Sequence, residues 1–384
     1  MICRSAKGHL LEVMKWLKEN GFHDMQSEAY SYASHASGSK SLEILRWLRE
    51  EGCPFDNMAY INAAKEGNLD ALKWLVEAEP VVWEARVCVE VAKEGHLEVL
   101  KWLRAQGCPW QDDKIVEPAI KSGRLDLLLW VREEIGEASK QQKWREKYCA
   151  IAAKNGYLEM LKWLRAQGCP WPTKLLMQTL QDWHDIPQRT KALKWAIRNG
   201  CPFGIKEMKT VVAYKNFGML KCMYKVMVAS NPLRVIDWNE EFCTRAAQCG
   251  HRRMLEWLRE HGCPWDVTTA VAAAQWISLG ILKWAREQGC PWDESVCTAA
   301  ARGGRLDVLK WAREQGCPWD ASTCSEAAYG GHLEVLKWAR EQGCPWNAKV
   351  CTNAALMRHI SVLEWARENG CDWDEETATS TEKV

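Results

Sequence analysis

The chain lacks a surplus of charge of either sign, and it lacks long apolar runs. Its 51 Lys and Arg residues face 50 Asp and Glu residues, which gives a formal net charge of +1. Proteins that coat nucleic acid or anionic membranes are usually strongly basic. No apolar run reaches the roughly 18 residues of a membrane-spanning helix, and the opening MICRSAKGH has no signal-peptide core. We therefore expect an intracellular protein, cytoplasmic or nuclear, without a membrane partner.

Motifs of catalysis and metal binding are also missing. The sequence has no Gly-rich phosphate loop, no His-Glu-x-x-His, no kinase signature and no Cys-x-x-Cys. The one unusual acid–base cluster is His184 with Asp182 and Asp185. Three such residues do not make a site without a pocket, so loop polarity is the favoured interpretation. We predict no catalytic activity, no metal and no cofactor, and an enzyme with a site near residues 182–185 stays a minor alternative.

Phenylalanine is scarce, with 5 residues, whereas tryptophan is abundant, with 24. This imbalance indicates that one tryptophan position is copied along the chain. Repeats at a fixed period determine the fold class, so they are considered first. Residues 293–319 are followed by a near copy that begins at Asp320, and Trp311, Trp338 and Trp365 lie 27 residues apart. The full series is Trp16, Trp47, Trp74, Trp102, Trp130, Trp163, Trp195, Cys222 in place of Trp, Trp257, Trp284, Trp311, Trp338 and Trp365. It predicts about thirteen repeats.

One repeat has the pattern of two helices. Asp293 suits an N-cap, and a first helix with Cys and paired Ala residues follows until Gly303-Gly304 interrupts it. A second helix is predicted from about residue 306 to 315, ended by Gly316 and Pro318. No window alternates like a β-strand. The fold class is therefore an all-α solenoid of helix-turn-helix repeats.

Fifteen of the 18 cysteines follow the same period, nine in the turn after the second helix and six in the first helix. Equivalent residues of stacked helices lie about 10 Å apart, whereas a disulfide needs Cα atoms within about 7 Å. We expect a series of unpaired, mostly buried thiols, which suits a reducing compartment.

The array is predicted to be a single domain over residues 1–373. It comprises regular repeats at 2–168, degenerate repeats at 169–236 and regular repeats at 237–373, before a disordered polar tail at 374–384. The degenerate repeats act as a hinge or as a specific site. Whether residue 1 is the natural start is left open, because the first repeat begins inside a helix.

Two copies of one motif carry a resemblance to a known family. Residues 92–102 read AKEGHLEVLKW and residues 328–338 read AYGGHLEVLKW. The motif recurs about ten times and resembles the ankyrin repeat, in the divergent Gly-Cys-Pro-Trp form found in large DNA viruses and some algae and oomycetes. A usual ankyrin unit has 33 residues, and Cys324 and Ser325 stand where its Leu and His would be. The resemblance implies an ankyrin-like solenoid with shortened or missing β-hairpin fingers.

This resemblance also implies a function. Such arrays bind other proteins along the concave face of their first helices, so the expected function is a non-catalytic scaffold or adaptor, acting as a monomer, in the host cell if the chain is viral. The partner would be an unidentified protein, and nucleic acid is not expected. Positions that differ between repeats form the predicted surface: Glu294, Ser295, Thr298, Arg302, Ser322, Ser325, Glu326, Tyr329, Lys349, Thr352, Asn353, Leu356 and Met357.

The aromatic residues of the turns leave an alternative open. A packed seam is the favoured interpretation, but an exposed aromatic stripe could bind peptide or stack bases. A nucleic-acid-binding solenoid would then need a basic stripe on one face. The turn aromatics are Phe55, Trp83, Trp110, Trp144, Trp171, Phe203, Trp238, Trp265, Trp292, Trp319, Trp346 and Trp373.

Overall fold

The computed structural model describes residues 11–21, 28–35, 39–54, 58–78, 81–136, 144–181, 187–230, 236–276 and 279–372. Within these ranges the regular elements are 25 α-helices, without a strand. No helix of the described ranges is long and apolar enough to cross a membrane. All thirteen residues of the predicted tryptophan series, Cys222 included, lie on helices, so the prediction of an all-α solenoid is confirmed.

The helices, in chain order, are α2 (Leu11–Glu19), α3 (Glu28–Ser34), α4 (Ser39–Glu50), α5 (Met58–Lys65), α6 (Leu69–Ala78), α7 (Ala85–Glu94), α8 (Leu97–Ala105), α9 (Asp112–Lys121), α10 (Leu125–Ile135), α12 (Glu146–Asn155), α13 (Leu158–Ala166), α14 (Leu175–Gln181), α15 (Pro187–Arg198), α16 (Ile205–Ala213), α17 (Phe217–Ser230), α18 (Glu240–Gln248), α19 (Arg252–Glu260), α20 (Val267–Trp276), α21 (Leu279–Glu287), α22 (Glu294–Arg302), α23 (Leu306–Glu314), α24 (Ala321–Tyr329), α25 (Leu333–Glu341), α26 (Lys349–Leu356) and α27 (Ile360–Glu368).

The chain divides into two compact units. Unit 1 comprises residues 1–175 and 184–202, and unit 2 comprises residues 176–183 and 203–384. The division falls inside the block 169–236 that was predicted to be degenerate. The prediction of one domain over 1–373 stays a prediction. The tail 374–384 and Trp373 lie outside the described residues.

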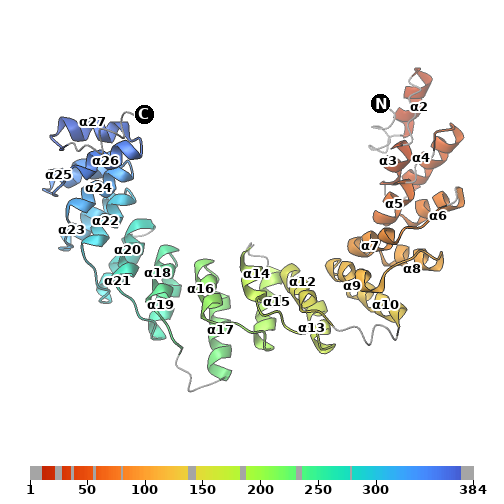
Figure 1. The fold of residues 1–384 in the computed structure, drawn as a ribbon, viewed down its shortest axis with the longest axis horizontal. Helices are drawn as coiled ribbons and strands as arrows, with labels where there is room; N and C mark the ends of the chain where they lie inside the picture. The colour runs from red at the N-terminus through yellow and green to blue at the C-terminus, as the bar shows by residue number, and fades with distance from the viewer. Residues whose placement is uncertain are drawn as a thin grey trace. The chain divides into compact units, whose positions relative to one another are not determined.

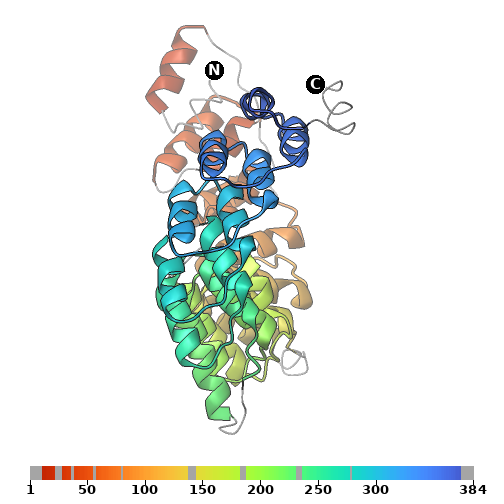
Figure 2. The ribbon, with the colours of Figure 1, turned by 90° about the vertical axis from the view of Figure 1, so that its left-hand side faces the viewer.

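In unit 2 the first helices of the repeats form one row, and the second helices form a row beside it. Figure 1 shows α18, α20, α22, α24 and α26 following one another, and Figure 2 shows the same succession from the side. Neighbouring first helices pack on each other, and each also packs on the second helix of its own repeat. Small side chains allow this approach, because Ala299, Ala300 and Ala301 of α22 are all buried.

The ends of the helices explain the period. The Asp293 carboxylate accepts a hydrogen bond of 2.9 Å from the Ser295 N–H and so caps α22. After α23, Gly316 has a φ of +78°, and the Cys317 N–H reaches back to the Ala312 carbonyl at 2.9 Å. Only Asp320 separates Trp319 from α24. No β-hairpin can therefore stand between these two repeats.

The second helix of each repeat contributes at least two buried residues to the core. In α23 these are Val308, Leu309 and Ala312, all buried. Leu306, the first residue of α23, is half-buried. The stack therefore buries a continuous core of short side chains, which leaves the larger indole rings nearer to the surface.

None of the described cysteines forms a disulfide, and all of them except Cys249 are buried. Their arrangement was only partly foreseen. Within one repeat, the first-helix thiol meets the turn thiol, so that the Sγ atoms are 3.1 Å apart for Cys88 and Cys108 and 3.5 Å apart for Cys243 and Cys263. The hydrogen bond to Cys108, with burial, raises the pKa of the Cys88 thiol. The sequence argument compared equivalent positions of neighbouring repeats and missed this contact between two positions of the same repeat.

Candidate functional site

Tryptophan rings from neighbouring repeats meet edge to face. Trp319, in the turn after α23, lies 5.9 Å from Trp338 of α25 between ring centroids, at an interplanar angle of 64°. Both rings are half-buried, so the turn aromatics are packed at one edge and still reach solvent. The same pairing recurs at Trp83–Trp102, Trp110–Trp130, Trp144–Trp163, Trp171–Trp195, Trp265–Trp284, Trp292–Trp311 and Trp346–Trp365.

An arginine lies over most of the turn tryptophans. The guanidinium carbon of Arg340 is 4.2 Å from the ring centroid of Trp346, and its Nη1 donates to the Cys344 carbonyl at 2.6 Å. The planar guanidinium suits both contacts at once. The other pairs with the same residue spacing are Arg104–Trp110, Arg165–Trp171, Arg259–Trp265, Arg286–Trp292 and Arg313–Trp319.

A second cation lies near the tryptophan of the second helix. The Nζ of Lys310 is 5.8 Å from the ring centroid of Trp338, and the Nζ of Lys283 is 5.7 Å from that of Trp311. Two repeats before Lys310, glutamate occupies the lysine position.

At that repeat the cation is supplied from another place. Arg252, one helical turn before Glu256, holds this carboxylate at 2.8 Å and lies 5.9 Å from the ring centroid of Trp284. The cation near the ring is thus kept although the residue that supplies it changes.

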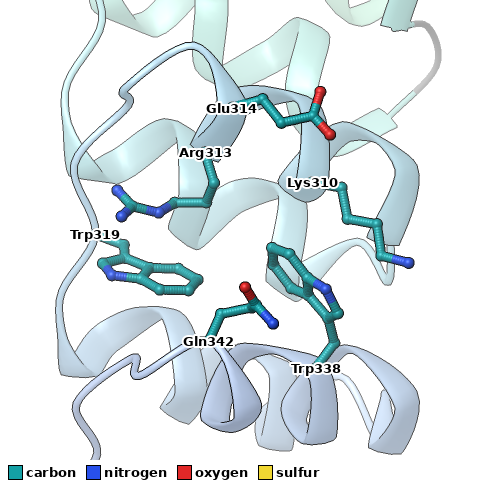
Figure 3. A pocket seen from close by; sticks show the side chains of 6 residues that line it. All are labelled: Lys310, Arg313, Glu314, Trp319, Trp338 and Gln342. Atoms are coloured by element: carbon teal, nitrogen blue, oxygen red, sulfur yellow. The ribbon is translucent and has the colours of Figure 1, made fainter.

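These side chains enclose a hollow on the second-helix side of the solenoid. Figure 3 shows Arg313 over Trp319, Lys310 beside Trp338, and Gln342 between the two indoles. The hollow has a volume of about 510 Å³, and Glu314 completes its wall. Two repeats earlier, a hollow of about 460 Å³ has the equivalent lining: Glu256, Arg259, Glu260, Trp265, Trp284 and Gln288. The repeat therefore builds the same concave site again.

The hollows are not strongly basic. The first combines Lys310 and Arg313 with one carboxylate, and the second combines Arg259 with the carboxylates of Glu256 and Glu260. Such a surface offers aromatic faces and paired charges rather than a row of unopposed cations. It favours a flat, polar ligand that stacks.

Another hollow, of about 320 Å³, lies on the first-helix side of unit 1. Arg86 of α7 and Lys114 of α9 contribute its cations, and Ala85, Val89 and Gln111 complete the lining. It has no tryptophan, so it offers no stacking surface.

The predicted first-helix residues lie on three neighbouring helices. Glu294, Ser295, Thr298 and Arg302 belong to α22; Ser322, Ser325, Glu326 and Tyr329 to α24; Lys349, Thr352, Asn353 and Leu356 to α26, with Met357 directly after it.

The structure brings some of these residues together. Arg302 lies 3.6 Å from the Glu326 carboxylate and 5.0 Å from the Tyr329 ring centroid, and Asn353 donates to the Ser325 carbonyl at 2.9 Å. Ser325 and Thr352 are buried, each with 6% exposure. Those two hydroxyls are turned toward their own helix, as Ser325 donates to the Ser322 carbonyl and Thr352 to the Ala348 carbonyl. They form no part of an open surface.

The histidines of the repeat have a structural role where it is seen. The Nε2 of His332 lies 3.1 Å from the Arg302 carbonyl, so Nε2–H is the donor. His359 makes the same bond to Tyr329, at 3.1 Å. The cluster of Asp182, His184 and Asp185 lies outside the described residues. Among the residues that are described, no group of three or more His, Cys, Asp or Glu could hold a metal ion.

Comparisons with known proteins give structural neighbours only. No family model matches the chain, and no curated protein sequence matches it. One similar solved structure is the pentatricopeptide repeat protein PPR10 with an 18-nt psaJ RNA element, at a TM-score of 0.37, 13% identity, 96% coverage of this chain and 65% of that chain. A cysteine-to-serine form of the same complex gives the same values. PPR10 from maize matches at a TM-score of 0.30 and 12% identity, over 99% of this chain and 69% of that chain.

The match covers 65% of the protein chain in each of the two RNA complexes. Because these neighbours are pentatricopeptide repeat proteins, the assignment to the ankyrin family is wrong. The residues that suggested it form the Gly-His break between two helices, and such a break serves any stack of helix pairs.

The predicted scaffold function, with a protein partner and without nucleic acid, is contradicted as well, since two of these neighbours carry RNA. That prediction used the net charge of the whole chain, which averages over both faces and conceals the cations placed at indole rings. At TM-scores of 0.37 and 0.30 the likeness says nothing further of this chain.

Proposed function

We propose that the protein binds single-stranded nucleic acid along the tryptophan hollows of its second-helix side. The observation that supports this most is the recurrence, repeat after repeat, of two half-exposed indoles with at least one cation beside them. In unit 2, four successive turn tryptophans have such a partner: Trp265, Trp292, Trp319 and Trp346.

Stacking would supply the affinity. A base stacked on an aromatic side chain contributes about 1–3 kcal/mol when measured by alanine substitution, and every base has a face to offer. Arg313 and Lys310 add cation contacts at the same hollow, and guanidinium planes also stack on bases. A row of sites then binds one strand more tightly than any single hollow, because the sites are linked.

The spacing favours an extended single strand. Packed helices lie about 8–10 Å apart, so hollows of successive repeats cannot match bases stacked at about 3.4 Å. Bases in a duplex are paired and stacked on each other, and their faces are not available to the indoles. An unpaired strand can turn its bases toward the protein one at a time.

The charge of the hollows bears on how the strand is held. With Glu314 and Glu260 beside the cations, phosphate neutralisation would be only a part of the binding free energy. The near-neutral chain is compatible with a ligand that is held mainly by base stacking. No catalytic step belongs to this proposal.

The proposal is tested by comparing two double variants, one in the hollows and one on the first-helix side, in their binding to a labelled strand. Fluorescence anisotropy would follow a 20-nucleotide single strand of mixed sequence, as RNA and as DNA, and the duplex of each. Lys283→Glu with Lys310→Glu changes the hollows, and the fold already accepts glutamate there at Glu256. We expect this variant to bind at least about tenfold more weakly, since two favourable charges become unfavourable ones.

The matched control changes the first-helix row. The predicted surface there stays a proposal, and its exposed cations are Arg302 and Lys349. Arg302→Ala with Lys349→Ala removes two cations from that side and is expected to leave binding unchanged. Loss of binding in this control alone would transfer the site to the first helices. If the wild-type chain bound no single strand, or bound the duplex equally well, the proposed function would be wrong.

A further inference from the structure

A glutamine side chain lines each of the two tryptophan hollows described above, Gln342 in one and Gln288 in the other. Glutamine follows the second helix directly at Gln106, Gln167, Gln288, Gln315 and Gln342. All five side chains are exposed, and none has a hydrogen-bond partner within the described ranges. In Figure 3 the amide of Gln342 lies between Trp319 and Trp338. A donor and an acceptor are thus presented beside the aromatic faces.

Other described repeats show that the side-chain amide is left without a hydrogen-bond partner only where this position holds glutamine. Where the same position holds Asn199 or Asn369, the side-chain amide donates to the carbonyl of its own tryptophan, at 2.7 Å and 2.8 Å. His261 lies 2.8 Å from the Trp257 carbonyl by its Nδ1. The shorter side chains close the end of the helix, whereas the longer glutamine extends beyond it. The capping role therefore does not account for glutamine.

From this placement we infer that the glutamine hollows are adenine subsites. The inference rests on the proposed function and names the base that it recognises. The adenine ring stacks at an indole, its N6 amino group donates to the glutamine Oε1, and an adjacent ring nitrogen accepts from Nε2. Glutamine pairs in this two-bond manner with adenine N6 and N7. Gln288, Gln315 and Gln342 occupy consecutive repeats of unit 2, so the ligand is a strand with a run of adenines.

The chemistry of the other bases fits less well. Guanine presents two acceptors, N7 and O6, on its outer edge, which leaves the glutamine acceptor unmatched. Pyrimidines have a smaller ring to stack. On the same edge cytosine presents only its N4 donor and uracil only its O4 acceptor, so adenine alone offers a donor beside an acceptor there, N6 with N7.

The experiment compares homopolymers. Labelled 20-nucleotide strands of oligo(A), oligo(C) and oligo(U) would be titrated with the full chain, and oligo(A) would be used as RNA and as DNA. We expect oligo(A) to bind at least about tenfold more tightly than oligo(C), since one good bidentate pair discriminates by about five- to 150-fold. Both sugar forms present the same base edge. Binding of one form alone identifies the source of the strand and keeps the inference.

The decisive variant has native precedent. Gln288→Asn, Gln315→Asn and Gln342→Asn together introduce the residue that the fold already holds at Asn369. We expect this triple variant to lose the preference for oligo(A) and to keep its affinity for oligo(C), because the stacking surfaces are unchanged. Equal binding of oligo(A) and oligo(C) by the wild-type chain would overturn the inference and leave the proposed function standing. So would a preference that survives in the triple variant. Absence of binding to every strand would refute both.

Discussion

The guanidinium carbon of Arg313 lies 4.2 Å from the ring centroid of Trp319, and the Nη1 of the same side chain donates to the carbonyl of Cys317. One residue thus fixes both the backbone of the turn and the ring that follows it. The arrangement depends on local spacing, because the arginine precedes the cysteine by four residues and the tryptophan by six. The turn therefore fixes one wall of the hollow, and Trp338 and Gln342 of the next repeat supply the other.

Replacing Arg313 tests this link through stability. We expect Arg313→Ala to lower the free energy of unfolding by about 1–2 kcal/mol, as it loses a cation–π contact of about 0.5–1 kcal/mol and a hydrogen bond of about 0.5–1.5 kcal/mol. Arg313→Lys should recover only part of this, because lysine keeps the charge without the planar stack. Urea unfolding followed by circular dichroism measures both variants. An alanine variant as stable as the wild type would show that the contact does not hold the turn.

A second prediction concerns the break between the two helices of a repeat. Gly304 has a φ of +67°, and a Cβ there would lie 2.6 Å from Nδ1 of His332. Gly304→Ala therefore combines backbone strain with a clash. Gly316 has a φ of +78° with nothing within 4 Å of such a Cβ, so Gly316→Ala carries the strain alone, about 1–2 kcal/mol.

The two glycine variants form a matched pair. We expect Gly304→Ala to cost about 1–3 kcal/mol more than Gly316→Ala in urea unfolding, the range found for overpacked sites. Adding His332→Ala should remove the clash and most of this extra cost, although the hydrogen bond to Arg302 is lost with it. Equal costs for the two glycine variants would mean that the His332 ring moves aside freely.

The helix pairs could be predicted from the sequence because every signal for them is local. Asp293 caps the next turn, Gly316 ends a helix, and the period of Trp311 and Trp338 repeats the unit. The two-unit division could not be predicted, because it depends on how tightly the degenerate repeats pack. It was also not possible to predict which of the variable residues are open, since the burial of Ser325 depends on the neighbouring helix α26.

The candidate site was foreseen only in outline. The sequence indicated a row of turn aromatics, and packing was favoured over exposure. The structure places Trp319 between these two interpretations, packed at an edge and half-exposed. The partner of each ring belongs to the next repeat, 19 residues later for Trp338, and the cation belongs to the preceding helix. The free amide of Gln342 was missed, and its signal was its recurrence directly before the Gly-Cys-Pro turn.

Buried thiols predict how stability depends on alkaline pH. Burial raises the pKa of Cys290 from 9.0 to about 12. Between these values the folded chain keeps the thiol proton, and the unfolded chain releases it, so unfolding is favoured as the pH rises. We expect the contribution of Cys290 to be complete below pH 9 and lost by pH 12.

The matched variant for this effect is Cys290→Ala. Lysine and tyrosine side chains titrate in the same interval in both proteins, so the difference between the two unfolding curves isolates the thiol. Urea midpoints of the wild type and the variant should converge as the pH rises from 8.5 to about 11. Parallel midpoints across that interval would contradict a raised pKa in the folded chain.

The salt dependence of strand binding separates stacking from phosphate neutralisation. For single strands, the logarithm of the binding constant falls with the logarithm of the salt concentration at a slope of about −0.7 for each neutralised phosphate. In the hollow at Trp338, Lys310 is the most exposed cation, and Glu314 is a carboxylate in the same lining. We therefore expect about one neutralised phosphate for each occupied repeat. A strand across four hollows should give a slope of about −3 or shallower. Lys310→Glu should make the slope shallower by about 0.7. Anisotropy titrations between 50 and 300 mM KCl measure both slopes. A much steeper slope, unchanged by that variant, would place the strand on a different and more basic surface.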